Sequence, residues 1–166
     1  MSLQKLSTPD WLQSPAAILY STGPIRTSVD IRELLARELS VHGAVEGENL
    51  TQRGPAVAIP ANQAHVLSMA VHELATNAVK HGALSKNNGH IDISWDVHDR
   101  GSCKEFRLFW RERGVQIPHE PARRGYGSDI LEKSIPHMMQ GHFERTFHRD
   151  GIECTIIFAL QAGQIS

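Results

Sequence analysis

The sequence predicts an α+β fold in which a mixed, mostly antiparallel sheet carries helices on one face. Two patterns support this prediction: apolar residues recur at helical spacing in the first half of the chain and alternate at strand spacing in the second half. The length of 166 residues and the hydrophobic content of 40% suit a single domain with a sizeable core. The expected architecture is therefore a two-layer sandwich.

Two helices and a short strand are expected in the first half. Residues 28–43 predict a short helix. After the polar stretch 44–54, residues 56–59 are a strand candidate, and Pro60 suits the first turn of a long helix that ends near Gly82. The apolar positions at helical spacing are Ile31, Leu34, Leu35 and Leu39 in the first helix and Val66, Leu67, Ala70, Leu74 and Ala78 in the second.

The second half predicts two pairs of antiparallel strands. Residues 91–97 and 106–111 alternate between apolar and polar side chains on either side of a short loop. Residues 143–148 and 152–160 form a closing hairpin around the turn 149–151. These four segments are expected to supply the sheet.

Between these pairs lies a segment without a periodic pattern, followed by another helix. Residues 113–127 are rich in Gly, Pro and Arg. Ser128 can cap a helix that continues through Ile135, until Pro136 interrupts it.

Composition and charge exclude several classes of function. The formal net charge of -1 gives no overall attraction to nucleic acid or anionic lipid, so any phosphate binding must come from a local site. Cys103 and Cys154 lie far apart, which argues against a zinc knuckle or a disulfide framework and favours a reducing cytoplasm. No apolar run approaches the length of a membrane span. His137, His142 and His148 fall close together but lack the spacing of a metal site.

The long helix combines an apolar face with two oxygen-bearing side chains. Glu73 and Asn77 are four residues apart, so they share one face of this helix. Oxygens on a packed helix cost free energy of desolvation unless they have partners. Mg²⁺ prefers oxygen ligands and is usually bound by one or two protein groups beside nucleotide phosphates. The pair therefore favours a site for a metal–nucleotide complex.

Three segments carry a resemblance to a known family. They read His72-Glu73-Leu74-Ala75-Thr76-Asn77 on the long helix, Trp110-Arg111-Glu112 at the end of a strand, and Gly125-Tyr126-Gly127 before a helix. In this order they match the N, G1 and G2 boxes, and the chain resembles the catalytic and ATP-binding domain of sensor histidine kinases in the GHKL superfamily. The histidine of the N box and the W-x-E of the G1 box resemble, more narrowly, the HWE branch of bacterial histidine kinases. The resemblance implies the Bergerat ATP-binding fold.

The resemblance implies a magnesium ligand and two catalytic candidates on the long helix. Asn77 would bind Mg²⁺ directly. Glu73 would position or deprotonate a water or the acceptor nucleophile. His72, which names the branch, is the second catalytic candidate, and a buried structural histidine is the alternative.

The resemblance also implies the groups that hold ATP. Glu112 would accept a hydrogen bond from the adenine amino group, Trp110 would be a core residue and a wall of the adenine pocket, and Gly114 would let the backbone approach the base. The remaining residues expected at the nucleotide are Lys80, His81, Arg123, Arg124, Gly125, Gly127, Ser128 and Thr155. For the lysine and the arginines, the alternative is a solvated surface position. For Thr155, the alternative is that threonine simply favours β-strands.

The same resemblance implies a domain organisation and an activity. Residues 28–161 would be the catalytic ATP-binding domain, residues 1–27 a linker from a missing dimerisation domain, and residues 162–166 a tail. The implied activity is ATP-dependent phosphorylation of a histidine on the dimerisation domain of a homodimeric parent, and a response regulator would act downstream. None of the ten histidines sits in the expected phosphoacceptor context. The cofactors would be ATP and Mg²⁺, the location cytoplasmic, and nucleic acid no partner.

Two other classes share the expected fold. A catalytically degenerate binding module, such as a pseudokinase or a histidine phosphotransferase-like protein, would lose the boxes, whereas Glu73, Asn77, Glu112 and Gly127 are all present. A serine kinase of the anti-sigma type would use the same magnesium chemistry. The W-x-E and H-E-L-A-T-N signatures favour the histidine kinase.

Overall fold

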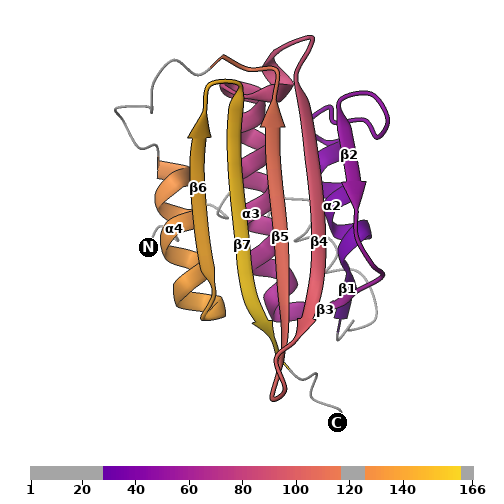
Figure 1. Ribbon diagram of the computed structural model, residues 1–166, viewed down its shortest axis with the longest axis vertical. Coiled ribbons are helices and arrows are strands. Elements are labelled where there is room, and N and C mark those ends of the chain that lie inside the picture. The colour runs from indigo at the N-terminus through magenta and orange to yellow at the C-terminus, as the bar shows by residue number, and fades with distance from the viewer. Residues whose placement is uncertain (1–27, 117–125, 162–166) are drawn as a thin grey trace, which may run out of the picture.

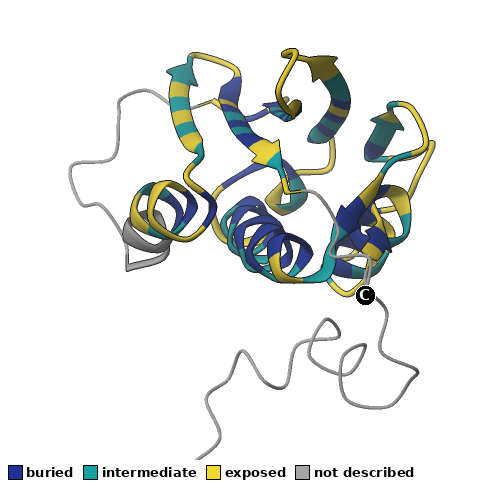
Figure 2. Ribbon diagram, turned by 90° about the horizontal axis from the view of Figure 1, so that it is seen from below, coloured by how far each residue is buried: buried dark blue, intermediate teal, exposed yellow. Residues whose placement is uncertain are grey.

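The computed structural model describes residues 28–116 and 126–161, with the side chains of 126–130 excepted. These residues form two layers, a five-stranded sheet and three α-helices that cover one of its faces (Figure 1). Figure 2, seen along the layers, shows the helices together on one side of the strands and the buried residues between them. The predicted α+β sandwich is confirmed. The expected linker, residues 1–27, and the tail, residues 162–166, lie outside the described residues.

The sheet is mixed and mostly antiparallel, as expected. Its strand order is β2-β4-β5-β7-β6, and only the β2–β4 pair is parallel. The strands are β2 (Leu50–Arg53), β4 (His90–Asp99), β5 (Lys104–Arg113), β6 (His142–His148) and β7 (Gly151–Leu160). A separate two-stranded sheet pairs β1 (Ser28–Asp30) with β3 (Ala58–Pro60).

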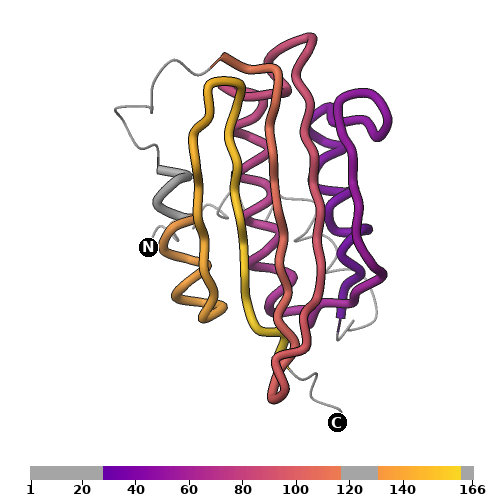
Figure 3. Tube along the Cα trace, in the orientation of Figure 1, coloured from indigo at the N-terminus to yellow at the C-terminus, as the bar shows by residue number. Residues whose placement is uncertain are grey.

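The helices are α2 (Ile31–Ser40), α3 (Ala61–Lys80) and α4 (Tyr126–Met139), and a short 3₁₀ turn, η2 (Ala83–Ser85), follows α3. The carboxylate of Asp30 caps α2 by accepting a hydrogen bond from the Glu33 N–H at 3.0 Å. The tube view shows α3 in the middle of the helix layer, with α2 and α4 on its two sides (Figure 3). The central helix therefore carries the N box across the middle of the sheet.

Alternation along the strands sorts side chains between the helix-covered face and the open face. In β4, Ile91, Ile93 and Trp95 are buried, whereas the intervening Asp92 and Ser94 are not. The same parity in the other strands gives a core that α3 completes with Leu67, Ala70, Val71, Leu74 and Ala78. Burial of these side chains on a single face is what holds the two layers together.

Three sequence expectations need correction. Residues 50–53, in the stretch read as merely polar, form the edge strand β2, which pairs through its backbone with β4 and buries Leu50 but little else. The strand predicted at 56–59 spans 58–60 and joins β1 instead of the main sheet. Helix α4 begins at Tyr126 rather than Ser128 and continues through Pro136 to Met139, since a proline in the last turn removes one helical N–H without ending the helix.

Candidate functional site

The fold brings the N box and the G1 box to the same end of the molecule. Asn77 begins the last turn of α3, and Glu112 lies one residue before the end of β5. Gly127 and Ser128 lie in the first turn of α4, which packs beside α3 and runs in the opposite direction (Figure 1). Arg123, Arg124 and Gly125, which were expected to face the phosphates, lie outside the described residues.

The side chains of Glu73 and Asn77 are half-buried and remain available to a ligand. Their neighbours Leu74, Ala75 and Ala78 are fully buried in the core. Within the described part of the chain, neither the Glu73 carboxylate nor the Asn77 amide forms a side-chain hydrogen bond. Lys80, the last residue of α3, and His81, which follows the helix and does not extend it as expected, are exposed. The polar pair thus has oxygen atoms that accept no side-chain hydrogen bond from the residues the structure describes.

Glu112 is buried, with 1% of its surface exposed, and both of its oxygens accept hydrogen bonds. Oε2 accepts from the backbone N–H of Ala83 at 2.8 Å, and Oε1 accepts from the indole N–H of Trp110 at 3.0 Å. Ala83 starts the turn that follows α3. The carboxylate therefore joins the end of strand β5 to the end of the N-box helix.

Both groups that donate to the Glu112 carboxylate are neutral. Burial raises the pKa of its carboxyl group above the usual value, and the N–H groups of Ala83 and Trp110 offset part of that rise. A carboxylate can accept about four hydrogen bonds, so the two observed bonds leave capacity for another donor. Such a buried, electron-rich acceptor suits a neutral N–H donor of a ligand.

Two glycines make this arrangement possible. A Cβ atom on Gly82 would lie 2.0 Å from Oε2 of Glu112 and 2.8 Å from the Cα atom of Ala78. A Cβ atom on Gly114 would lie 2.2 Å from the carbonyl oxygen of Asn88, and Gly114 also has a positive φ of 80°. Gly114 was expected to admit the adenine base, whereas its observed close neighbour is this backbone.

His72 points toward α2 rather than along the Glu73–Asn77 face. Its Nδ1 atom lies 3.5 Å from Oε2 of Glu38 and 3.4 Å from Nε2 of His42. Glu38 is 1% exposed, and its Oε1 accepts a hydrogen bond from the Ser68 hydroxyl at 2.5 Å. The histidine that names the branch thus joins helices α2 and α3 through a buried carboxylate.

The two histidines of this cluster respond to it in opposite ways. The interaction with the Glu38 carboxylate raises the pKa of His72, with a smaller contribution from the charge of Glu73. Burial lowers the pKa of His42, and the neighbouring His72 lowers it further. The pKa values of the two histidines thus move apart, and a proton on His72, when present, compensates the charge of Glu38.

The remaining expected residues are placed differently. Trp110 is fully buried, so it is a core residue that contacts Glu112 from inside. Thr155 pairs with Phe109 on the open face, between the buried Cys154 and Ile156, and the structure does not bring it to Glu112. Sequence reasoning missed four contributors to these contacts: Glu38, Ser68, Gly82 and the backbone of Ala83.

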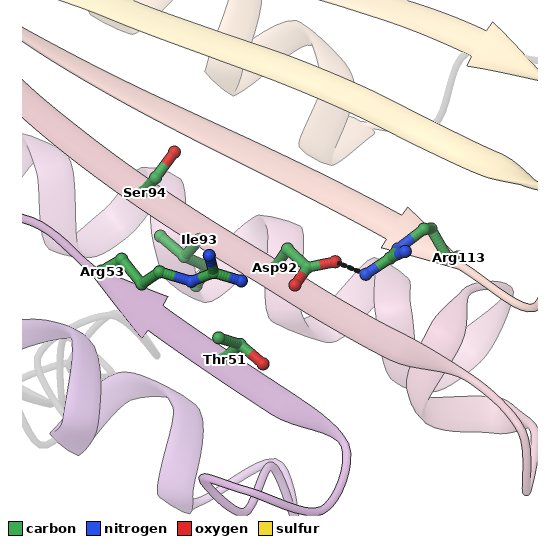
Figure 4. Close-up of a pocket in the computed structure, with 6 residues that line it drawn as sticks. All are labelled: Thr51, Arg53, Asp92, Ile93, Ser94 and Arg113. Carbon is green, nitrogen blue, oxygen red and sulfur yellow. Dashed lines mark hydrogen bonds and ion pairs between the residues drawn. The ribbon is translucent and has the colours of Figure 1, made fainter.

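A surface pocket of about 280 Å³ lies on the other face of the sheet (Figure 4). It is lined by Thr51, Arg53, Asp92, Ile93, Ser94 and Arg113, and Arg113 forms an ion pair with Asp92. Because Asp92 and Ser94 alternate with the buried residues of β4, this pocket is separated from the N box by the sheet itself. It contains none of the residues expected to bind ATP.

Two further observations concern metal clusters and membrane spans among the described residues. No group of three or more His, Cys, Asp or Glu side chains among them is arranged to hold a metal ion. None of the helices in this part of the chain has the length and apolarity required to cross a membrane.

In sequence, the chain is similar to bacterial histidine kinases. It is 30% identical over 136 residues to a blue-light-activated histidine kinase of Brucella anthropi, a match that covers 82% of this chain and 28% of that protein. A kinase of the same description from Rhizobium johnstonii is 29% identical over 126 residues, covering 76% of this chain and 35% of the relative. The chain therefore spans about a third or less of the curated relatives it matches. No protein-family profile matches it.

Solved structures show the same fold. The histidine kinase domain of an Erythrobacter litoralis blue-light activated histidine kinase superposes with a TM-score of 0.62 at 18% identity, covering 91% of this chain and 72% of that one. The catalytic domain of histidine kinase ThkA gives a TM-score of 0.59 at 16% identity, covering 81% and 96%. The fold is thus that of these histidine kinase catalytic domains. The chain is a homologue of the blue-light-activated histidine kinases over the part of their length that it matches.

Proposed function

We propose that this chain is the ATP-binding catalytic domain of a two-component sensor histidine kinase of the HWE branch. It would position Mg-ATP for phosphorylation of a histidine on a separate dimerisation domain. The observation that carries the proposal is the Glu73–Asn77 pair, half-buried on α3 with no side-chain hydrogen bond to the described residues, beside the turn that Glu112 holds. The kinase names of the sequence relatives support the same conclusion.

The residues on α3 fit a magnesium–nucleotide complex. Mg²⁺ takes few protein ligands and completes its octahedron with water and phosphate oxygens, so a single amide oxygen from Asn77 is a suitable donor. A neutral amide also avoids repelling the triphosphate. When bound, the ion would neutralise charge on the transferred phosphoryl group. Glu73, one turn earlier, would hold a water or the acceptor group and take its proton.

Glu112 supplies the means of recognising adenine. The exocyclic amine of adenine is a donor, whereas guanine presents a carbonyl at the equivalent position, which a buried carboxylate would repel. A site built around such an acceptor discriminates strongly between the two bases. The turn that Glu112 holds keeps the carboxylate next to the end of α3, within the same region as Asn77.

The phosphoacceptor and the receiver of the phosphoryl group would be supplied by other segments and by another protein. Residues 1–27 would connect the domain to its dimerisation helices, and the phosphoacceptor histidine would lie on those helices in a homodimeric, cytoplasmic kinase module. A response regulator would receive the phosphoryl group. In support, histidine kinase ThkA, whose fold is similar, has been solved in complex with the response regulator TrrA. Alone, the chain is expected to bind ATP and to turn over little.

The first test is the removal of the Glu112 carboxylate. We expect Glu112→Ala to weaken ATP binding on the order of 100-fold, because the adenine amine loses a charge-assisted partner worth roughly 1.5–3 kcal/mol and the turn after α3 loosens. Isothermal titration calorimetry with Mg-ATP measures this, and thermal unfolding checks that the variant is folded. An affinity equal to that of the unchanged chain would refute the adenine role.

The second test separates metal binding from packing. We expect Asn77→Ala to weaken ATP binding roughly tenfold in Mg²⁺ and much less in EDTA, because the missing amide oxygen matters only when the ion is present. Equal losses in both buffers would assign Asn77 to packing. Phosphotransfer from ATP to a supplied dimerisation domain of a related kinase then tests the complete activity.

A further inference from the structure

The W-x-E spacing has a direct structural meaning. Trp110 and Glu112 are two residues apart on β5, so both side chains point to the helix-covered face. Trp110 is fully buried, and its indole N–H donates to Oε1 of Glu112 at 3.0 Å. The tryptophan thus reaches the carboxylate from the interior of the sheet.

The opposite oxygen of the same carboxylate is held from another element. Oε2 accepts from the Ala83 N–H at 2.8 Å, and the absence of a Cβ atom on Gly82 leaves the room that this contact needs. Two donors from different directions fix both side-chain torsions at the end of Glu112. Without the indole N–H, Oε1 would be a buried acceptor with no described donor, and the carboxylate would have reason to turn.

We propose that Trp110 is a positioning residue for nucleotide recognition, whose indole N–H orients the Glu112 carboxylate for the adenine amine. This inference rests on the proposed function, because it needs Glu112 to be the group that reads adenine. Trp110 itself does not touch the nucleotide. Its contribution is the direction in which the remaining acceptor positions of Glu112 point.

A hydrogen bond from Trp110 also favours the ionised form of Glu112, which gives a second observable. Burial raises the pKa of Glu112, and the Trp110 N–H counteracts that rise, so its removal should raise the pKa further. Other groups around the site are Cys154 of β7, a buried thiol whose pKa is raised to about 12 by burial, Arg145 of β6, and the exposed His81. Cys154 stays neutral at ordinary pH, so it cannot mimic this change.

The experiment compares two tryptophan-to-phenylalanine variants. Trp110→Phe removes the N–H that faces Glu112 and leaves an aromatic ring in the core. Trp95→Phe is the matched control: Trp95 is also buried on a neighbouring strand, and its N–H donates at 2.8 Å to the carbonyl of Pro55, away from Glu112. Affinities for Mg-ATP and Mg-GTP are measured by calorimetry across pH 5 to 8, with thermal unfolding beside them.

For Trp110→Phe we expect roughly tenfold weaker ATP binding and a smaller ratio of ATP to GTP affinity. The pH below which ATP affinity falls should also move upward, because only the ionised Glu112 accepts the adenine amine. Trp95→Phe should keep the selectivity and the pH profile of the unchanged chain, even if it lowers the unfolding temperature as much. A purely structural tryptophan would move stability alone.

The outcomes separate this inference from the proposed function. If the unchanged chain binds neither nucleotide, the proposed function fails and the inference fails with it. If it binds ATP through Glu112, but Trp110→Phe retains its affinity, selectivity and pH profile, only the positioning role is overturned. Should Trp110→Phe not fold, 3-benzothienylalanine at position 110 replaces the N–H with sulfur at nearly constant shape, and the same measurements decide.

Discussion

Two buried carboxylates, Glu38 and Glu112, each with 1% of the residue exposed, are held in different ways. Glu112 accepts from two neutral donors, the N–H groups of Ala83 and Trp110. Glu38 accepts from the Ser68 hydroxyl and lies beside the imidazole of His72. Both hydrogen-bond donors to Glu112 are neutral, whereas Glu38 lies beside a group that can become a cation.

Under the proposed function, this difference would separate a recognition group from a structural one. An imidazole can carry a proton that compensates the charge of Glu38, which leaves that carboxylate little to offer a ligand. Neutral donors orient Glu112 but leave its charge uncompensated, so a donor group on a ligand still gains from contacting it. Two equally buried glutamates would therefore have different roles. The difference depends on whether the group next to each carboxylate can carry a compensating proton.

The largest effect on the difference between the two carboxylates is expected from a steric change next to Glu112. Gly82→Ala would place a Cβ atom 2.0 Å from Oε2, so the carboxylate must move. We expect ATP affinity to fall by more than about tenfold and unfolding free energy by about 2 kcal/mol. Urea unfolding and calorimetry measure these two effects.

Gly101→Ala is the matched control for that variant. Gly101 has a φ of 80°, but a Cβ atom there meets nothing within 4 Å. Its strain should cost about 1 kcal/mol and leave ATP affinity unchanged. If Gly82→Ala bound ATP as well as Gly101→Ala does, the position of Glu112 would not matter for recognition.

Removal of the imidazole tests the other carboxylate. His72→Leu would leave Glu38 buried without a cation, and loss of one partner from a buried pair costs about 3–5 kcal/mol. Because the His72 side chain is 38% exposed, water screens the charge and we expect about 2 kcal/mol. Urea unfolding measures the loss. In a Glu38→Gln background, the same substitution should cost clearly less. Equal costs in both backgrounds would show that the two residues are not coupled.

The smallest expected effect is a dependence of stability on pH near Glu38. The pKa of His72 is raised from 6.5 by Glu38, so its stabilising contribution is complete below pH 6.5 and is lost as the pH rises through the folded-state pKa. The pKa of His42 is lowered by burial, so its contribution has the opposite sign and is lost as the pH falls below 6.5. The two losses lie on opposite sides of pH 6.5, so this cluster stabilises the chain most near that pH.

A His42→Asn variant should therefore keep the loss of stability above pH 6.5 and show a smaller loss below pH 6.5 than the unchanged chain. Urea unfolding at a series of pH values from 5 to 9 measures this. Glu73 also faces His72 electrostatically, so Glu73→Gln serves as a control that should lower the effect only slightly. A profile in His42→Asn that is flat above pH 6.5 would contradict a charged His72–Glu38 pair.

Much of the fold was predictable because alternation and helical spacing record which face of each element is buried. The exceptions have physical causes. Strand β2 is an edge strand held by backbone pairing, so Thr51, Gln52 and Arg53 carry no apolar signal. Thr155 could have been assigned correctly, because strict alternation between Cys154 and Ile156 already places it on the open face.

The sequence indicated which residues are candidates for the site, but it did not indicate the residues that contact and orient them. The positions of Glu73, Asn77 and Glu112 were recognisable because their residue types and order carry a family resemblance. Glu38 gave no such signal, because a glutamate next to apolar residues of a helix is normally predicted to lie at the solvent-exposed edge of that helix. Its partners lie 30 and 34 residues away, on another helix, and a contact between helices cannot be read from one sequence.

The two cysteines offer a way to measure how often the sheet opens in the region around Glu112. Cys103 is exposed in the turn between β4 and β5, whereas Cys154 is buried opposite Trp110 with its thiol pKa raised to about 12. Only the thiolate reacts with alkylating agents, so Cys103 should be labelled promptly and Cys154 only when the sheet opens locally. The rate of the second, slower labelling would report that opening, and bound ATP should slow it.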